Sequence, residues 1–188
     1  MIKPAFVLAL ILAATFAVHA QDAPKKDAPP KPAAGPSQAV LDTWNDVSRK
    51  LKAMAEDFPE DKYDFKPTPA QRSFAEQLLH AAGANYYFTN AVKGEKPPTE
   101  EQPPRSQFKN KAEIVAYVNK ALDDGAAVIK SKGDSGINDQ ILDTFSNSKV
   151  RVIDYAYGFA EHMGEHYGQL AVYYRVAGLV PPESRPKK

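Results

Sequence analysis

Apolar residues recur every three or four positions in four separate segments of this 188-residue chain, and this spacing limits the possible folds most strongly. The segments carry Val40, Trp44, Val47, Leu51, Met54 and Phe58; Phe74, Leu78, Ala81, Ala82 and Tyr86; Ile114, Val118, Ala121, Leu122 and Ile129; and Val152, Tyr155, Ala156, Phe159, Met163, Tyr167, Leu170 and Tyr174. Each pattern is typical of a helix with one apolar face, and no segment alternates convincingly as a strand would. Four such faces need partners, so the sequence predicts an all-α fold, a four-helix bundle.

Capping signals predict where the first two helices begin and end. Ser37 can cap the first helix. The sequence Thr68-Pro69-Ala70-Gln71 combines a capping Thr, a Pro at the first helical position and a Gln three residues after the cap. We therefore expect the second helix to begin after Thr68 and to run to about Val92, where Gly94 can close it.

The later helices and the connectors show weaker signals. Asn110 and Glu113 form a pair like a capping box at the start of the third helix, and the fourth helix should end before Gly178. We expect one further short helix over residues 137–145. The connector over residues 93–109 is long for a compact domain, and connectors of this length are usually functional or disordered. We expect it to lie over one end of the bundle.

The first 20 residues have the features of a secretory signal peptide. Lys3 precedes an uninterrupted apolar run over residues 5–18, and the small residue Ala20 comes just before Gln21. The run is shorter than the roughly 20 residues that a membrane-spanning helix needs. The sequence therefore predicts an exported protein, periplasmic or extracellular, with no stable membrane insertion after cleavage. The alternative is an uncleaved N-terminal anchor.

The composition of the remaining chain predicts its organisation. Residues 21–37 are rich in Pro, Lys and Ala and lack large apolar side chains, so we expect a disordered linker. Residues 38–182 are long enough for one domain with a core, and residues 183–188 are expected to form a disordered tail. The formal net charge of +1, with no basic block, argues against nucleic acid as a partner. The absence of Cys excludes disulfides and thiolate metal sites.

Three of the four histidines lie in two of the predicted helices, His80 in the second and His162 and His166 in the fourth. Residues four apart share a helix face, so His162 and His166 can direct their rings to one point, and a bundle can bring His80 there. Three neutral imidazoles suit a divalent transition metal and leave coordination positions open, as in catalytic sites. The small residues after His80, Ala81-Ala82-Gly83-Ala84, leave space for a pocket. The alternative is that all three are ordinary packed histidines.

Other side chains near these histidines are candidates for supporting roles. Glu165 completes the pattern H-x-x-E-H of inverted zinc peptidases, but the only downstream acid lies in the Pro-rich tail, so the third ligand of those enzymes is missing. We reject that class and keep Glu165 as the nearest candidate for a general base. Gln169 and Tyr173 return to the histidine face two turns later, and Tyr87 lies two turns after His80. Each can support a metal ligand, face the substrate or be a satisfied core residue.

The segments TPAQRSFAEQLLHAAGANYYF and HMGEHYGQLAVYYRVAGLVPP together resemble the DinB/YfiT-like superfamily. That family has one His in the second helix and H-x-x-x-H in the last, and the resemblance implies that His80, His162 and His166 are the metal ligands. The trailing Gly-Gln-Leu, Gly and Pro also resemble the family's usual ending. The resemblance covers residues 38–182 and implies an up-down-down-up connection of the helices, with Zn²⁺ or Ni²⁺ bound at one end of the bundle.

The resemblance also implies a class of function. The family is similar to thiol-dependent S-transferases and isomerases and to metal-dependent hydrolases. We therefore expect an exported protein that binds one divalent metal ion and acts as a hydrolase or transferase on a small molecule. One alternative is a metal-binding or small-molecule-binding module without turnover. Another is a thiol-dependent S-transferase, which export disfavours because cytosolic thiols are scarce outside the cell. The last is a structural bundle, possible as a homodimer, in which the histidines only pack.

Overall fold

The computed structural model describes residues 33–186, so the predicted signal peptide and most of the predicted linker lie outside the described residues. The helices and strands are α1 (Pro36–Asp57), α2 (Phe74–Gly83), α3 (Asn85–Lys93), α4 (Lys111–Gly136), β1 (Gln140–Asp143), β2 (Ser148–Arg151) and α5 (Val152–Val176). The two strands pair antiparallel, with Gln140 opposite Arg151. Among the helices of residues 33–186, none is long and apolar enough to cross a membrane.

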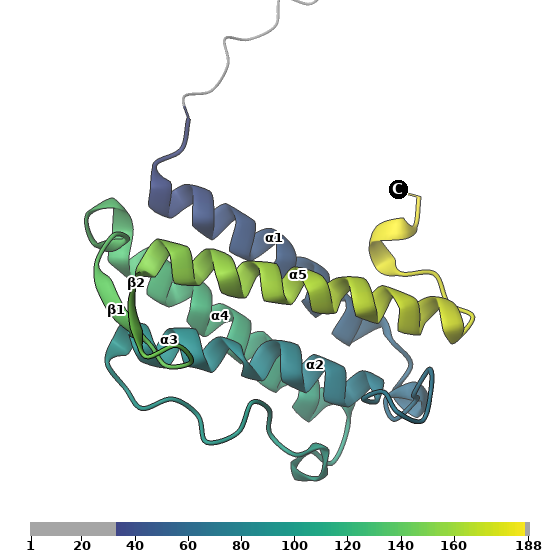
Figure 1. Ribbon diagram of the computed structural model, residues 1–188. Coiled ribbons are helices and arrows are strands. Elements are labelled where there is room, and N and C mark those ends of the chain that lie inside the picture. The colour runs from purple at the N-terminus through teal and green to yellow at the C-terminus, as the bar shows by residue number, and fades with distance from the viewer. Residues whose placement is uncertain (1–32, 187–188) are drawn as a thin grey trace, which may run out of the picture. The chain divides into compact units, whose positions relative to one another are not determined.

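The helices α2 and α3 follow one another along nearly the same line and form one rod of the bundle (Figure 1). The rod and α4 run in one direction, whereas α1 and α5 run in the other. This arrangement confirms the predicted four-helix bundle with an up-down-down-up connection. Because the rod and α4 are parallel, the connector between them returns along the length of the bundle, rather than lying over one end as expected.

The apolar residues that predict the helices form the core. Those exposed by at most 1% are Val40, Trp44, Leu51, Met54, Phe58, Phe74, Leu78, Ala81, Ala82, Ile114, Val118, Ala121, Leu122, Ile129, Val152, Ala156, Met163, Leu170 and Tyr174. Near the end of α1, the ring centroids of Phe58 and Phe74 lie 3.7 Å apart, and Tyr174 meets Phe58 edge-on at 4.8 Å. This aromatic cluster joins α1, α2 and α5 and supplies a large buried apolar area.

Trp44 determines how closely α1 and α4 pack. Its indole Nε1 donates a hydrogen bond to the Leu122 carbonyl oxygen at 2.9 Å. The indole ring lies directly against Gly125, where a Cβ atom would stand 1.9 Å from Trp44 Cζ2. Because no other residue lacks Cβ, only glycine at position 125 permits this approach.

The predicted starts of the first two helices are wrong. Gly35 is the N-cap of α1, and Ser37 lies in the first turn, where its N–H and its hydroxyl both donate to the Asp134 carboxylate of α4. A carboxylate at this position satisfies free N–H groups and interacts favourably with the helix dipole. The long-range contact with Asp134 therefore replaces the local cap that Ser37 was expected to provide.

The second helix begins at Phe74 rather than after Thr68. Ser73 and Glu76 form the capping box, in which the Ser73 N–H donates to the Glu76 carboxylate at 2.6 Å. The first two helical N–H groups donate to backbone carbonyls of the preceding loop, at 3.0 and 2.8 Å. These bonds fix the entry of the chain into α2. The predicted end of the rod is confirmed, since Gly94 has a φ of 73°, in the left-handed region.

Residues 137–145, predicted to form a short helix, instead lead into the β-hairpin. The Asp143 carboxylate accepts hydrogen bonds from the N–H groups of Phe145 and Ser146, at 2.9 and 3.3 Å. Asn147 completes the turn with a φ of 54°. Such side-chain bonds to nearby backbone favour turns over helices. The hairpin is a small addition to an otherwise helical fold.

The segment after α5, expected to be a disordered tail from residue 183, folds back onto α1. Glu183 accepts a hydrogen bond from Arg49 at 2.6 Å, and Arg185 donates to Asp57 at 2.7 Å. Pairs at the surface contribute about 0–1 kcal/mol each, so they position this segment without adding much stability.

Candidate metal centre

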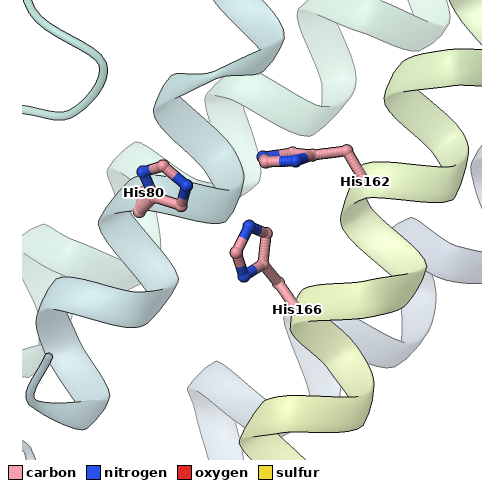
Figure 2. Close-up of side chains that lie close together, drawn as sticks. All are labelled: His80, His162 and His166. Carbon is pink, nitrogen blue, oxygen red and sulfur yellow. The ribbon is translucent and has the colours of Figure 1, made fainter. Parts of the chain in front are cut away.

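The structure brings together the three histidines that the sequence selects. His80 projects from α2 toward His162 and His166 on α5, and one nitrogen of each ring faces the space between them (Figure 2). One ligand nitrogen from each side chain lies within 4.8 Å of the other two. The ring centroids are separated by 4.3 Å between His162 and His166, and by 4.7 and 5.4 Å from His80. The cluster lies midway along α5, inside the bundle and not at the end that the resemblance implied.

The histidines are largely buried, and two of their nitrogen atoms have no hydrogen-bond partner in the part of the chain that the structure describes. His80 and His166 are 8% and 6% exposed, and His162 is half-buried. The atoms without a partner are Nδ1 of His80 and Nε2 of His162. A buried polar atom without a partner costs about 1–3 kcal/mol, so packed core histidines normally have one. The donor set therefore fits a bound metal ion better than simple packing.

Two glutamines orient His166. Its Nδ1 lies 2.5 Å from Gln77 Nε2 and 3.1 Å from Gln169 Oε1, and the two glutamines also hydrogen-bond to each other. These contacts leave Nε2 of His166 for the space between the three rings. Gln169 is one of the residues predicted to support a ligand. Gln77 was not predicted, although it lies three residues before His80 and therefore near the same helix face.

The connector after α3 brings a carboxylate to the cluster. Glu101 Oε2 lies 3.6 Å from His80 Nδ1, which is too long for a hydrogen bond. The same atom is 4.0 Å from Nη2 of Arg72. Gly83 permits the connector to approach, because a Cβ there would lie 2.9 Å from the Glu101 carbonyl oxygen. Glu101 was not predicted from the sequence, and the only signal for it was the lack of a side chain at Gly83.

The other predicted residues differ in how close they lie to the histidines. Tyr87 lines a cavity of about 360 Å³ that also includes His80 and His162. Glu101 and Glu165 are both exposed, but only Glu101 lines this cavity, so Glu165 is the poorer candidate for a general base. Tyr173 is buried, and its hydroxyl donates to the Arg72 carbonyl oxygen at 2.7 Å, so it fixes the segment before α2.

Burial keeps the three imidazoles neutral. It lowers the pKa of His80 to about 4, and the positive charges of Arg72 and of the other two histidines would add to this effect. Burial also lowers the pKa of His162 and of His166. A neutral imidazole has a free lone pair, and only this form binds a metal ion. The cluster is therefore ready to bind a metal at neutral pH.

Comparison with known families agrees with this geometry. Residues 16–170 match the model of the DinB superfamily, which is more than half of the chain. The chain belongs to the DinB superfamily. Among curated proteins, no sequence matches it.

Solved structures of DinB-like proteins share the fold of this superfamily member. A DinB-like protein from Bacillus cereus has a TM-score of 0.64 and 16% identity, covering 77% of this chain and 95% of its own. YfiT from Bacillus subtilis is described as a probable metal-dependent hydrolase with an unusual four-helix bundle topology. It has a TM-score of 0.60 and 13% identity, covering 83% of this chain and 97% of its own. At these identities the likeness shows a common fold.

The lowered histidine pKa values predict that the metal-free protein loses stability in mild acid. An unfolded histidine has a pKa of about 6.5, whereas His80 has a folded-state pKa of about 4. Between these values the unfolded state binds more protons, so the free energy of unfolding falls as the pH falls. We expect a loss of roughly 2 kcal/mol from His80 between pH 6.5 and 5, measured by urea unfolding in the presence of chelator.

His80→Asn serves as the control for this measurement, because asparagine does not titrate. The variant should lose less stability than the wild type over the same pH range. Carboxyl groups with lowered pKa values contribute mainly below about pH 5, so they do not mask the effect. An equal slope in both proteins would contradict the assignment to His80.

Proposed function

We propose that this DinB-superfamily member is an exported metal-dependent hydrolase that holds one divalent ion through His80, His162 and His166. The carrying observation is that three neutral imidazoles meet within 4.8 Å and that two of their buried nitrogens have no partner. Imidazole ligands suit Zn²⁺ and Ni²⁺, and three of them leave open positions for water and substrate. The description of the similar YfiT as a probable metal-dependent hydrolase supports the same class of reaction.

The chain's own residues provide the orientation that such a site needs. A bound divalent ion lowers the pKa of its water and polarises a substrate oxygen. With Nε2 of His166 as the ligand, its Nδ1 would carry the proton and donate a hydrogen bond to Gln169 Oε1, which lies 3.1 Å away. Hydrogen bonds of this kind fix the tautomer and the ring orientation of metal-binding histidines. The Gln77 Nε2 amide donates a hydrogen bond to Gln169 Oε1 and so acts on His166 through Gln169.

Glu101 is the residue that we propose as the general base. It lines the same cavity as His80 and His162, and its carboxylate lies 3.6 Å from the His80 ring. A proton acceptor must come within hydrogen-bond reach of the group it deprotonates, directly or through one water. Glu165, which the sequence suggested for this role, does not line the cavity.

Glu101→Gln and Glu165→Gln form a matched pair that tests this proposal. Elemental analysis should find about one Zn²⁺ or Ni²⁺ per chain in the wild type and in both variants. In a screen of small esters, amides and phosphoesters, chelator should abolish turnover. Glu101→Gln should lower kcat/KM by about 10²–10⁴, while Glu165→Gln should change it by less than about twofold.

Three outcomes would count against parts of the proposal. Absence of bound metal would remove the metal site itself. Bound metal without turnover on any substrate would favour a binding module. A large loss of kcat/KM in Glu165→Gln, with little change in Glu101→Gln, would assign the role of general base to Glu165.

A further inference from the structure

The cavity beside the histidine cluster has the size and position of a substrate site. Its volume is about 360 Å³, within the range of about 300–1,000 Å³ that is usual for small-molecule pockets. His80, His162 and Glu101 form the side nearest the proposed metal. The remaining walls come from α3, α5 and the β-hairpin. A molecule in this cavity therefore lies next to the open side of the histidine cluster.

Four aromatic residues also line this cavity: Tyr87, Phe145, Tyr155 and Phe159. The ring of Phe145, at the tip of the hairpin, lies 4.7 Å from that of Tyr87, with 38° between the planes. On α5, Tyr155 and Phe159 meet edge-to-face with their centroids 5.0 Å apart. Phe145 is nevertheless 62% exposed, which is unusual for a side chain of this size. The turn around Asp143 holds it over the cavity instead of letting it pack into the core.

Among residues 33–186, the charged side chains that line this cavity are the carboxylates of Glu101 and Asp143, and no Lys or Arg lines it. Arg72, whose Nη2 lies 4.0 Å from Glu101 Oε2, lines a separate cavity together with Gln77 and Gln169. While no metal is bound, two carboxylates around an apolar pocket repel an anionic group and tolerate a neutral or cationic one. The two carboxylates therefore disfavour the binding of anionic ligands to this cavity.

We propose that this cavity binds the flat apolar end, of the size of a benzyl group, of a small uncharged substrate, and that its carboxylates disfavour anionic ligands when no metal is bound. The reacting group of the substrate then points toward His80 and His162. This inference rests on the proposed function, because it names the class of substrate for the same site. Phe145 and Tyr87 contact the flat apolar end of the substrate. The Glu101 and Asp143 carboxylates disfavour a negatively charged ligand.

Benzyl alcohol, benzylamine and benzoate test the proposal because they have similar sizes and different charges. Each is titrated into the full protein after chelator treatment, and binding is followed by NMR chemical-shift changes. In metal-free protein the result does not depend on hydrolysis. We expect benzyl alcohol and benzylamine to bind at least about tenfold more tightly than benzoate, a difference equal to about 1.4 kcal/mol. Glu101→Gln should reduce the difference in affinity between benzylamine and benzoate.

Phe145→Ala and Tyr157→Ala provide the matched structural test. Both remove an exposed aromatic side chain, since Tyr157 is 41% exposed, but only Phe145 lines the cavity. Phe145→Ala should weaken binding of benzylamine about tenfold, and Tyr157→Ala should leave it unchanged. Equal binding of benzoate and benzylamine, or an unaltered affinity in Phe145→Ala, would overturn the proposal. Binding as expected without any turnover would instead refute the hydrolase and leave the cavity assignment intact.

Discussion

Chelation of the metal is expected to lower the melting temperature of the wild-type protein without unfolding it. A ligand that binds only the folded state adds about 2.7 kcal/mol when its free concentration is a hundred times its dissociation constant. For a domain of this size, that corresponds to roughly 5–10 °C. The bundle should stay folded because its core, from Trp44 to Tyr174, does not depend on the histidines. Differential scanning calorimetry with and without chelator measures the effect.

His80→Ala separates a metal ligand from a packing residue. If His80 is a metal ligand, the His80→Ala variant should lose most of the increase in melting temperature that metal gives. In chelator, its melting temperature should be nearly that of the wild type. If His80 only packs, chelator should have no effect on the wild type, and the variant should be destabilised by the cavity left behind. A wild type that is insensitive to chelator would falsify the metal site.

Gly125→Ala is expected to destabilise the protein by about 3 kcal/mol or more, because the new methyl group has no space. Its carbon would lie 1.9 Å from Trp44 Cζ2, so α1 and α4 must separate or the indole must turn. Either movement would also lengthen or break the hydrogen bond from Trp44 to the Leu122 carbonyl oxygen. Alanine has the higher helix propensity by about 1 kcal/mol, which offsets only part of this cost. Urea unfolding gives the difference.

Gly168→Ala is the matched control, since it makes the same change in an exposed part of α5. A Cβ at position 168 would have no atom within 4 Å, so this variant should be stabilised by up to ~1 kcal/mol. Adding Trp44→Leu to Gly125→Ala should recover part of the lost stability, because the smaller side chain makes room. Equal stability of the two single variants would mean that α1 and α4 are not packed this closely.

The sequence predicts the helices well because their apolar spacing reports burial directly, but it predicts their ends poorly. Two capping signals compete before α2, at Thr68 and at Ser73. Hydrogen bonds from the start of α2 to a loop that is close only in the folded chain decide between them. The Asp134 carboxylate at the start of α1 is likewise a contact between distant residues. The hairpin was missed because its strands are only four residues long and carry too few apolar residues to show an alternating pattern in the sequence.

The candidate site is predictable where its residues share a helix and unpredictable where they do not. The spacing of His162 and His166 places them together in any helix, and Gln169 follows on the same face. Bringing His80 to them required the bundle and the resemblance to a family. Glu101 lies in a connector without periodicity, next to Glu100, and nothing in the sequence says which acid reaches the histidines. That choice depends on the path of the connector past Gly83.

The order of the helices along the chain also affects how the protein is synthesised. The partners of α1 are chiefly α4 and α5, and the first of these begins only at Lys111. On the ribosome, α1 therefore emerges long before any helix that can cover its apolar face. Contacts between such distant segments slow folding, and they leave apolar surface open to chaperones in the meantime. His162 and His166 lie on α5, the last helix to be synthesised. The core is therefore closed and the histidine cluster assembled in the same late step of folding.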